Sequence, residues 1–267
     1  VDDKGFVSPA DLEAAIRPDT ILATIMFANN EIGTIQPIKE LGEVCRRHGV
    51  MFHVDGVQAA GHIKVDVEQL PIDMMTMAAH KMYGPKGLGA LYVRRGVKLI
   101  PTLHGGGQEF GLRSGTENVP GIVGFGVAAE IAKERLERGD DKKLAQLRDY
   151  FIDGVLSRIP ESHLTGAAGD ARLPFHTSFT VKYIEGEGML LLLDAAGIAA
   201  SSGSACTSGS LEPSYVLLAT GLDHTTAHGS VRLTMSHDTT KEDIDYVLEK
   251  FPEIVEKLRA MSPFYKK

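Results

Sequence analysis

Cys206 is a thiol in the segment SSGSACTSGS, residues 201–210, whose other residues are serine, glycine, alanine and threonine. A free cysteine is usually a small buried hydrophobe, but this segment holds no side chain that could pack a core around it. Serine- and glycine-rich segments are typical of solvated surface loops. Cys206 is therefore either incidental to such a loop or a nucleophile that the loop carries to its target.

Lys81 lies in the segment AAHKMYGPKG, after an apolar run and before a glycine-rich turn. At the end of a buried strand and between methionines, its pKa is expected to fall, because desolvation disfavours the ammonium form. A neutral lysine amine can condense with an aldehyde cofactor. A surface lysine at the start of a turn is the alternative, and Lys81 alone does not distinguish the two.

Asp55 ends the apolar run MFHVD. A carboxylate at the end of a buried strand needs a partner, and a protonated pyridine nitrogen is one. An aspartate in that place keeps the ring cationic, which makes the ring an electron sink. Gln58, three residues further on, could reach a ring hydroxyl. The competing interpretation is that Asp55 caps the segment that follows it.

Two further segments suit anions. HGGGQEFGLRSGTEN, residues 104–118, has three consecutive glycines followed by Arg113, Ser114 and Thr116. Glycine lets a backbone approach a ligand closely, and hydroxyls suit phosphate, although an ordinary tight loop could have this composition and neither a P-loop nor a dinucleotide fingerprint is present. Arg232, in HGSVRLTMS, lies inside a predicted strand, where its guanidinium needs a carboxylate of the protein or of a substrate.

Apolar runs and helical spacing predict an α/β fold with a mostly parallel sheet in the first half of the chain. The run TILATIMFANN is expected to be a strand buried on both faces, because it is almost continuously apolar. Cys45 falls at helical spacing with other apolar residues and is predicted to lie in the core. Ligands gather at the carboxyl ends of parallel strands, and Asn30, Asp55 and Lys81 are expected there. The expected strands are residues 20–30, 50–61, 72–81 and 89–95, and the expected helices begin at residue 8 and cover 37–49 and 121–138.

The character of the sequence changes near residue 138, and we predict one domain over residues 1–138 and a second over 139–267. The charges of GDDKKLAQLRDY are interpreted as a solvated face. Thr239 and Glu242 form a possible capping box for a helix that Pro252 is expected to kink or break. The other expected elements are strands in SFTVKYI and AGIAASSGSAC and a short buried helix in GEGMLLLLDAAG.

The composition is that of an ordinary globular protein, with 267 residues, 43% hydrophobic and 24% charged residues, and a net charge of −7. This charge argues against nucleic acid as the main ligand. No apolar run reaches transmembrane length, and no metal site is expected. Two cysteines far apart do not form a disulfide framework, which favours a reducing compartment such as the cytoplasm.

Five segments, in order along the chain, resemble motifs of the NifS/IscS-like cysteine desulfurases, which are pyridoxal-phosphate enzymes of the class V aminotransferase family. The segments are FANNEIGTIQPI, FHVDGVQAAG, AHKMYGPKGLGALYVRR, HGGGQEFGLRSGTEN and SSGSACTSGSLEPSYVL. The resemblance implies the α/β fold of fold type I pyridoxal-phosphate transferases. A large domain with a mostly parallel sheet, lacking its N-terminal part, would be followed by a smaller α+β domain that carries the cysteine loop.

The resemblance also implies which residues bind pyridoxal phosphate. Lys81 would hold the cofactor covalently and later move the α-proton of the substrate. His80, a further catalytic residue, would sit beside it near the phosphate. Asp55 would face the pyridine nitrogen, and Gln58 would contact the ring hydroxyl. Thr116 would reach the phosphate bound by a neighbouring subunit, which implies a homodimer.

For the substrate, the resemblance implies L-cysteine. Asn30 would contact the edge between cofactor and substrate, and Arg232, with the help of Asn30, would bind the substrate carboxylate. Cys206, on a mobile loop, would attack the substrate sulfur, leave a persulfide on the protein and release alanine. An iron–sulfur scaffold protein or a carrier for tRNA thiolation would accept the sulfur.

Two features depart from the family pattern. Ala78 stands where family members usually have a serine that serves the cofactor phosphate, so one phosphate contact is lost. The N-terminal part of the family is expected to be missing, with its phosphate loop and the histidine that stacks on the ring. The alternatives are therefore a truncated, non-catalytic remnant that acts as a dimerisation or binding module, or an activity like that of a selenocysteine lyase.

Overall fold

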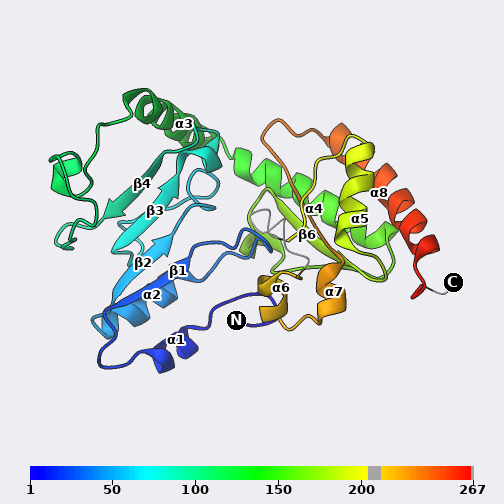
Figure 1. Cartoon of the computed structure of the whole chain (residues 1–267), viewed down its shortest axis with the longest axis horizontal. Helices are drawn as coiled ribbons and strands as arrows, with labels where there is room; N and C mark the ends of the chain where they lie inside the picture. Colours follow the sequence, from blue (N-terminus) through cyan, green and yellow to red (C-terminus); the bar gives the residue numbers. More distant parts are fainter. Residues whose placement is uncertain (204–211, 266–267) are drawn as a thin grey trace. The chain divides into compact units, whose positions relative to one another are not determined.

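The computed structural model describes residues 1–203 and 212–265, which Figure 1 shows as a coloured ribbon. The chain forms two compact units. Unit 1 comprises Val1–Ser8, Ala28–Pro37 and Gly139–Lys267, and unit 2 comprises Pro9–Phe27 and Ile38–Arg138. The predicted domain boundary at residue 138 coincides with one border between the units, whereas residues 1–8 and 28–37 belong with the C-terminal part of the chain. None of the described helices combines the length and the apolar character that a bilayer crossing requires.

Unit 2 is built on a four-stranded sheet in the order β1 (Leu22–Met26), β2 (Met51–Asp55), β3 (Met74–Ala78) and β4 (Gly89–Val93). The first three strands are parallel, and β4 runs antiparallel to β3. The predicted mostly parallel sheet is therefore confirmed. The helical elements of this unit are α1 (Pro9–Ala15), α2 (Ile38–Arg47), η1 (Ala79–Met82), η2 (Glu109–Gly111) and α3 (Val119–Glu137).

Helix α2 buries the apolar face that its spacing predicts, with Ile38, Leu41, Val44 and Cys45 all buried. Cys45 is 1% exposed, so its predicted place in the core is confirmed. Gly49 follows the helix with φ 65°, the left-handed conformation that glycine adopts without steric cost.

Strand β1 is not buried on both faces as predicted. Each of its five residues is exposed or half-buried, and Leu22 is 46% exposed. In the described sheet β1 lies at the edge and pairs with β2 alone. Its side chains therefore have neighbouring strand residues on one flank only, and an apolar composition does not bury them by itself.

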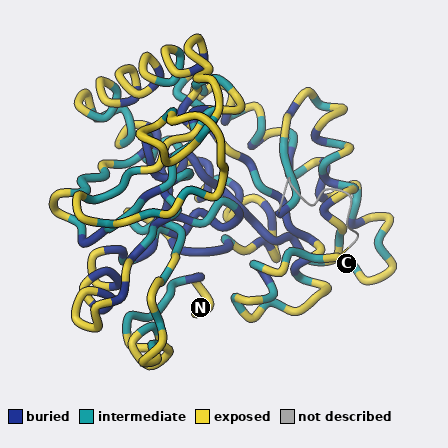
Figure 2. The backbone as a smooth tube through the Cα atoms, turned by 60° about the vertical axis from the view of Figure 1, so that its left-hand side comes forward, coloured by how far each residue is buried: buried dark blue, intermediate teal, exposed yellow. Residues whose placement is uncertain are grey.

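Unit 1 contains an antiparallel sheet in the order β5 (Ser162–Leu164), β6 (His176–Val181) and β7 (Ser230–Thr234). All six residues of β6 are buried. Figure 2 colours the backbone by burial, with buried residues in dark blue. The helical elements are α4 (Asp140–Arg158), η3 (Gly169–Ala171), α5 (Gly186–Ala195), α6 (Tyr215–Ala219), α7 (His224–His228) and α8 (Lys241–Met261), with α4 and α5 both packed against α8.

Two predictions in this unit are wrong. The segment 139–150 is more than a solvated face, because it opens α4, whose Arg148 is 1% exposed and donates to the carbonyls of Arg172 and Leu173. The part of the predicted strand AGIAASSGSAC that the structure describes forms only an isolated bridge, between Ser201 and Arg232. Its small residues give a strand little side-chain area to pack.

Helix α8 begins one residue later than predicted. The capping box uses Thr240 and Asp243 in place of Thr239 and Glu242. The Asp243 amide donates to Thr240 Oγ1 at 3.1 Å, and the Thr240 amide donates to Asp243 Oδ2 at 2.9 Å. The short aspartate side chain closes this box as a glutamate can in other proteins.

Pro252 does not break α8, which continues to Met261. A proline has no N–H, so the carbonyl of Leu248, one turn earlier, has no donor within the helix. Arg158, at the end of α4, donates its Nη1 to this carbonyl oxygen at 2.9 Å. The helix therefore tolerates the proline because α4 satisfies the carbonyl that the proline leaves open.

We predict that Arg158→Ala lowers the free energy of unfolding by about 1 kcal/mol, because the Leu248 carbonyl loses its donor. Pro252→Ala returns an N–H to the helix, so the loss caused by Arg158→Ala is expected to be smaller in that background. Urea denaturation of the four proteins of this double-mutant cycle measures the difference. Equal losses in both backgrounds would show that Arg158 does not serve this carbonyl.

Candidate active site

Asp55 lies at the carboxyl end of β2, beside the parallel strand β3, where it is in register with Thr76. Its Oδ1 accepts from the Val57 amide at 3.0 Å and from Thr76 Oγ1 at 3.4 Å. The bond to Val57 is the local cap that was the competing interpretation of Asp55. Both bonds use Oδ1, so the second oxygen of this half-buried carboxylate can accept from the N–H of a ligand.

Lys81 follows β3 in the short helix η1. The expected burial between methionines is wrong for the side chain. Met82 is buried, but Lys81 and His80 are exposed, because the turn of η1 directs neighbouring residues to different sides. The backbone is fixed instead, since buried His62 donates its Nε2–H to the Lys81 carbonyl at 2.6 Å and Tyr83 adopts φ 66° directly after η1.

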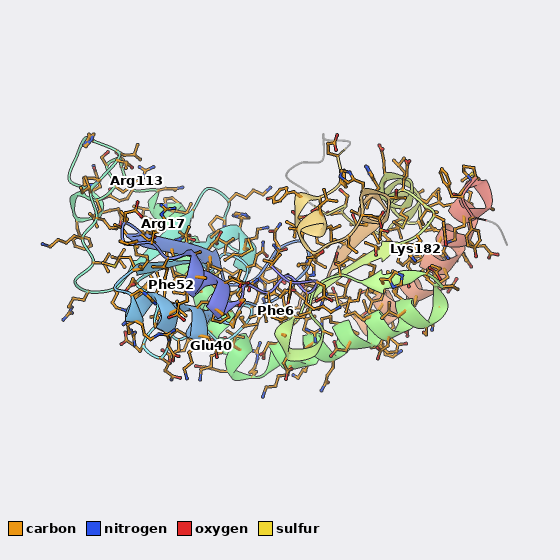
Figure 3. The ribbon with its side chains drawn as sticks, turned by 90° about the horizontal axis from the view of Figure 1, so that it is seen from below. Phe6, Arg17, Glu40, Phe52, Arg113 and Lys182 are labelled. Atoms are coloured by element: carbon orange, nitrogen blue, oxygen red, sulfur yellow. The ribbon has the colours of Figure 1, made fainter. Side chains whose placement is uncertain are left out.

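Gln58 and Thr116, which are also predicted to bind the cofactor, lie in unit 2, whereas Asn30, predicted to contact both cofactor and substrate, lies in unit 1. Gln58 is half-buried in the turn after β2, and Ala78 ends β3. Thr116 is exposed in the segment 104–118, where Glu109 and Phe110 both have positive φ. Figure 3 shows Arg113 on this outer segment, where its Nη1 donates to the Ser114 carbonyl at 2.5 Å. The roles of Gln58 and Thr116 stay predictions.

Unit 1 brings Asn30 and Arg232 together. Arg232, half-buried in β7, donates its Nη1 to the backbone oxygen of Asn30 at 2.5 Å. The turn that carries Asn30 is closed by Asn29, whose Oδ1 accepts from the amides of Glu31 and Ile32 at 2.8 and 3.0 Å. A guanidinium held in this way beside an asparagine can present further N–H groups to the carboxylate of a ligand.

Cys206 lies outside the described residues, but the residues on either side of its segment are placed. Ser201 pairs with Arg232 through two backbone hydrogen bonds of 2.9 and 2.7 Å. Ser214 donates its Oγ–H to Glu31 Oε2 at 2.5 Å and caps α6. One end of the segment that contains Cys206 is therefore bonded to Arg232, and the other end is bonded to Glu31, next to Asn30. We call Arg232 together with the Asn30–Glu31 turn the guanidinium site.

The sequence analysis missed Glu31 and His176. Glu31 is 3% exposed and lies in the motif NNEIG, where an acidic residue directly after the strand predicted over residues 20–30 was the available signal. His176 is 1% exposed at the start of β6 and donates its Nε2–H to the Asn30 oxygen at 3.0 Å. A single histidine among apolar and hydroxyl residues gave no signal, because its partner is 146 residues away in sequence.

Electrostatics keep His176 neutral. Burial, and next the positive charge of Arg172, lower the pKa of His176 to about 3. Arg172 is itself 1% exposed, and burial followed by the charge of Arg148 lowers its pKa to about 9. Because Nε2 donates to Asn30, the second ring nitrogen of the neutral imidazole is an acceptor, and it accepts from Arg172 Nη1 at 3.3 Å.

In chemical terms, unit 2 offers a carboxylate and a lysine amine that follow adjacent parallel strands. This set suits an aromatic aldehyde with a basic ring nitrogen, since the amine can bond the aldehyde carbon and the carboxylate can accept from the ring N–H. Unit 1 offers a guanidinium for a carboxylate. Among the described residues, no group of histidine, cysteine, aspartate and glutamate side chains could hold a metal ion.

Comparison with known proteins identifies relatives for almost the whole chain. A family model described as "Aminotransferase class-V" matches residues 1–247. The chain is 56% identical over 263 residues to the cysteine desulfurase IscS of Methanosarcina thermophila, covering 98% of this chain and 64% of the relative. It is 53% identical over 266 residues to the cysteine desulfurase IscS of Clostridium botulinum, covering 99% and 67%.

Among solved structures, a NifS-like protein has a TM-score of 0.87 and 38% sequence identity, covering 97% of this chain and 67% of that protein. The chain thus spans about two thirds of the length of the relatives that it matches. The similarity extends over both units.

We predict that His176 makes the fold sensitive to acid. The imidazole has a pKa of about 3 when folded and an ordinary value of 6.5, and the charged groups that face it are Arg172 and Arg232. Between these two pH values the unfolded chain binds a proton that the folded chain does not. The free energy of unfolding therefore falls as the pH drops through this window.

Urea denaturation at several pH values across the window measures this slope. His176→Gln is expected to have a shallower slope, and the same change at exposed His163 on β5 is the matched control. Identical slopes for His176→Gln and the unchanged protein would contradict the prediction.

Proposed function

The chain belongs to the aminotransferase class-V family, in its NifS/IscS-like group of cysteine desulfurases, and from this premise we propose that it removes sulfur from L-cysteine with pyridoxal phosphate. The products are alanine and a persulfide on Cys206. The observation that carries the proposal is the attachment of both ends of the Cys206 segment to the guanidinium site, through Ser201–Arg232 and Ser214–Glu31. To remove sulfur from a small amino acid, one group must bind the carboxylate of the amino acid and a thiol close to it must accept the sulfur.

The residues of unit 2 fit pyridoxal phosphate. Asp55 has a carboxylate oxygen for the pyridine N–H, and Lys81 has an exposed amine for the aldehyde. When bound, this cofactor supplies an electron sink for the charge left at Cα after loss of the α-proton. Gln58, His80 and Thr116 are proposed to contact the ring hydroxyl and the phosphate, while Ala78 provides no hydroxyl.

The remaining steps fall to side chains of the protein. Arg232 and Asn30 bind and orient the carboxylate of the substrate, and the Lys81 Nζ takes the α-proton. The Cys206 thiolate, the nucleophilic form of a thiol, attacks the substrate sulfur. An S–S bond forms as the C–S bond breaks. The electron pair of the broken bond stays on the substrate Cβ, which gains a proton to become the methyl group of alanine. Lys81 Nζ then returns a proton to Cα.

A homodimer is part of the proposal. Apolar side chains are exposed on both sides of Thr116, with Phe110 100% exposed and Leu112 42% exposed before it and Val119, at the start of α3, 60% exposed after it. Large apolar side chains exposed so close together in sequence support an interaction surface here. A second subunit that covers these side chains would also bring its own bound phosphate close to Thr116. Sulfur would then pass to an iron–sulfur scaffold or a sulfur-carrier protein in the reducing cytoplasm, where the Cys206 thiol is not lost to disulfide formation.

We predict that the purified chain retains a visible absorption band after addition of pyridoxal phosphate and desalting, and that Lys81→Ala abolishes it, because the amine that bonds the aldehyde is gone. Lys86→Ala is the matched control, since Lys86 is exposed on the loop five residues further on, and it is expected to retain the band. If all three proteins lack the band, the chain does not bind the cofactor unaided, and the non-catalytic alternative is favoured.

Cys206→Ser is predicted to retain the absorption band and to lose persulfide formation from L-cysteine, because a hydroxyl cannot accept the sulfur. Cys45→Ala, which removes the buried thiol of α2, is expected to form the persulfide normally. Labelling of persulfides and assay of alanine measure both outcomes. A faster reaction with selenocysteine that does not need Cys206 would contradict the proposal in favour of a selenocysteine lyase.

A further inference from the structure

The backbone oxygen of Asn30 accepts two hydrogen bonds from different parts of unit 1. Arg232 Nη1 donates from β7 at 2.5 Å, and His176 Nε2 donates from β6 at 3.0 Å. A carbonyl oxygen has two lone pairs, so these two donors use its full capacity. The position of this one oxygen therefore depends on both side chains, and the Arg232 guanidinium is held in part by an atom that His176 also holds.

His176 can act as a fixed support because its own ring is held on several sides. It lies in a strand that is buried at every residue, and its Nδ1 accepts from Arg172 Nη1 at 3.3 Å. Arg172 is anchored in turn by its Nε, which donates to the Ala167 carbonyl at 2.6 Å, and by its bond to the Thr165 carbonyl. The imidazole thus joins a rigid interior to the Asn30 turn.

Gly33 shows how closely the ring packs on this turn. A Cβ placed on Gly33 would come within 2.7 Å of His176 Nδ1, and the residue has φ +75°. Only glycine has both the backbone freedom and the small size that this contact requires. The turn is therefore shaped around the imidazole as well as bonded to it.

We propose that His176 is a positioning residue for the substrate carboxylate: its neutral imidazole fixes the Asn30 carbonyl, against which the Arg232 guanidinium is held. The inference rests on the proposed function of Arg232 and Asn30. His176 itself does not touch the substrate. Without its bond, the Asn30 turn loses its hydrogen bond to β6, and the oxygen that accepts from Arg232 Nη1 is held less firmly.

Two substitutions separate this role from simple filling of the interior. In His176→Gln the amide nitrogen can take the place of Nε2 and donate to Asn30, whereas in His176→Asn the shorter amide reaches only the place of Nδ1. Thr180→Val is the matched control, because Thr180 is 1% exposed on the same strand and its Oγ1 has no hydrogen-bond partner among the described residues.

The first measurement is hydrogen exchange of the Glu31, Ile32 and Gly33 amides, which are bonded within the turn. His176→Asn is expected to speed their exchange about tenfold, the effect of one lost hydrogen bond, whereas His176→Gln and Thr180→Val leave it nearly unchanged. Equal exchange in all four proteins would overturn the proposal, and so would equally fast exchange in His176→Gln and His176→Asn.

The second measurement is the steady-state reaction with L-cysteine. His176→Asn is expected to raise KM about tenfold with a smaller change in kcat, because binding of the carboxylate is weakened, and His176→Gln is expected to restore KM. An unchanged KM in His176→Asn would overturn the link to the substrate. If the unchanged protein does not react with L-cysteine, the proposed function fails, and the exchange data still decide whether His176 holds the turn.

Discussion

Buried guanidinium groups bonded to backbone carbonyls are the interaction on which unit 1 depends. Arg148, Arg172 and Arg259 are each at most 4% exposed, and burying such a charge is costly unless its N–H groups are satisfied. Arg148 donates to the carbonyls of Arg172 and Leu173, and Arg259 donates to that of Pro160 at 2.7 Å. These bonds require the carbonyls of particular loops to stay in place, so each arginine fixes irregular backbone that regular strands and helices cannot fix.

The same hydrogen bonds also hold the residues of the guanidinium site in place. Arg172 orders His176, His176 and Arg232 order the Asn30 carbonyl, and Arg232 pairs through its backbone with Ser201. The positive charge of Arg172 also disfavours protonation of the imidazole, which keeps Nδ1 an acceptor and Nε2 a donor. The Arg172 guanidinium, whose burial requires carbonyl partners, therefore also keeps the imidazole of His176 neutral, which is the state in which His176 accepts from Arg172 and donates to Asn30.

The sequence predicted the elements that local patterns determine and missed those that distant contacts determine. Helix α2 follows from the spacing of its apolar residues, and β2 from its apolar run and terminal Asp55. Strand β1 has an equally apolar sequence, but its burial depends on its place at the edge of the described sheet, which no local pattern encodes. Pro252 stays inside α8 because of an arginine 94 residues earlier in the chain, Arg158, whose bond to Leu248 spans 90 residues. His176 could not be found for the same reason.

The residues predicted to bind the cofactor and those predicted to bind the substrate fall mainly in different units. Asp55 and Lys81 belong to unit 2, whereas Asn30, Arg232 and both described ends of the Cys206 segment belong to unit 1. Because the short stretch Ala28–Pro37 is part of unit 1, Asn30 is placed by β6 and β7 and not by the sheet strand that precedes it in sequence. The distance between the Arg232 guanidinium, which is proposed to bind a carboxylate, and the described ends of the Cys206 segment is therefore set within one unit. In the proposed chemistry, the hydrogen bonds of unit 1 position the residues that bind the substrate. The residues that follow β2 and β3 in unit 2 bind the cofactor.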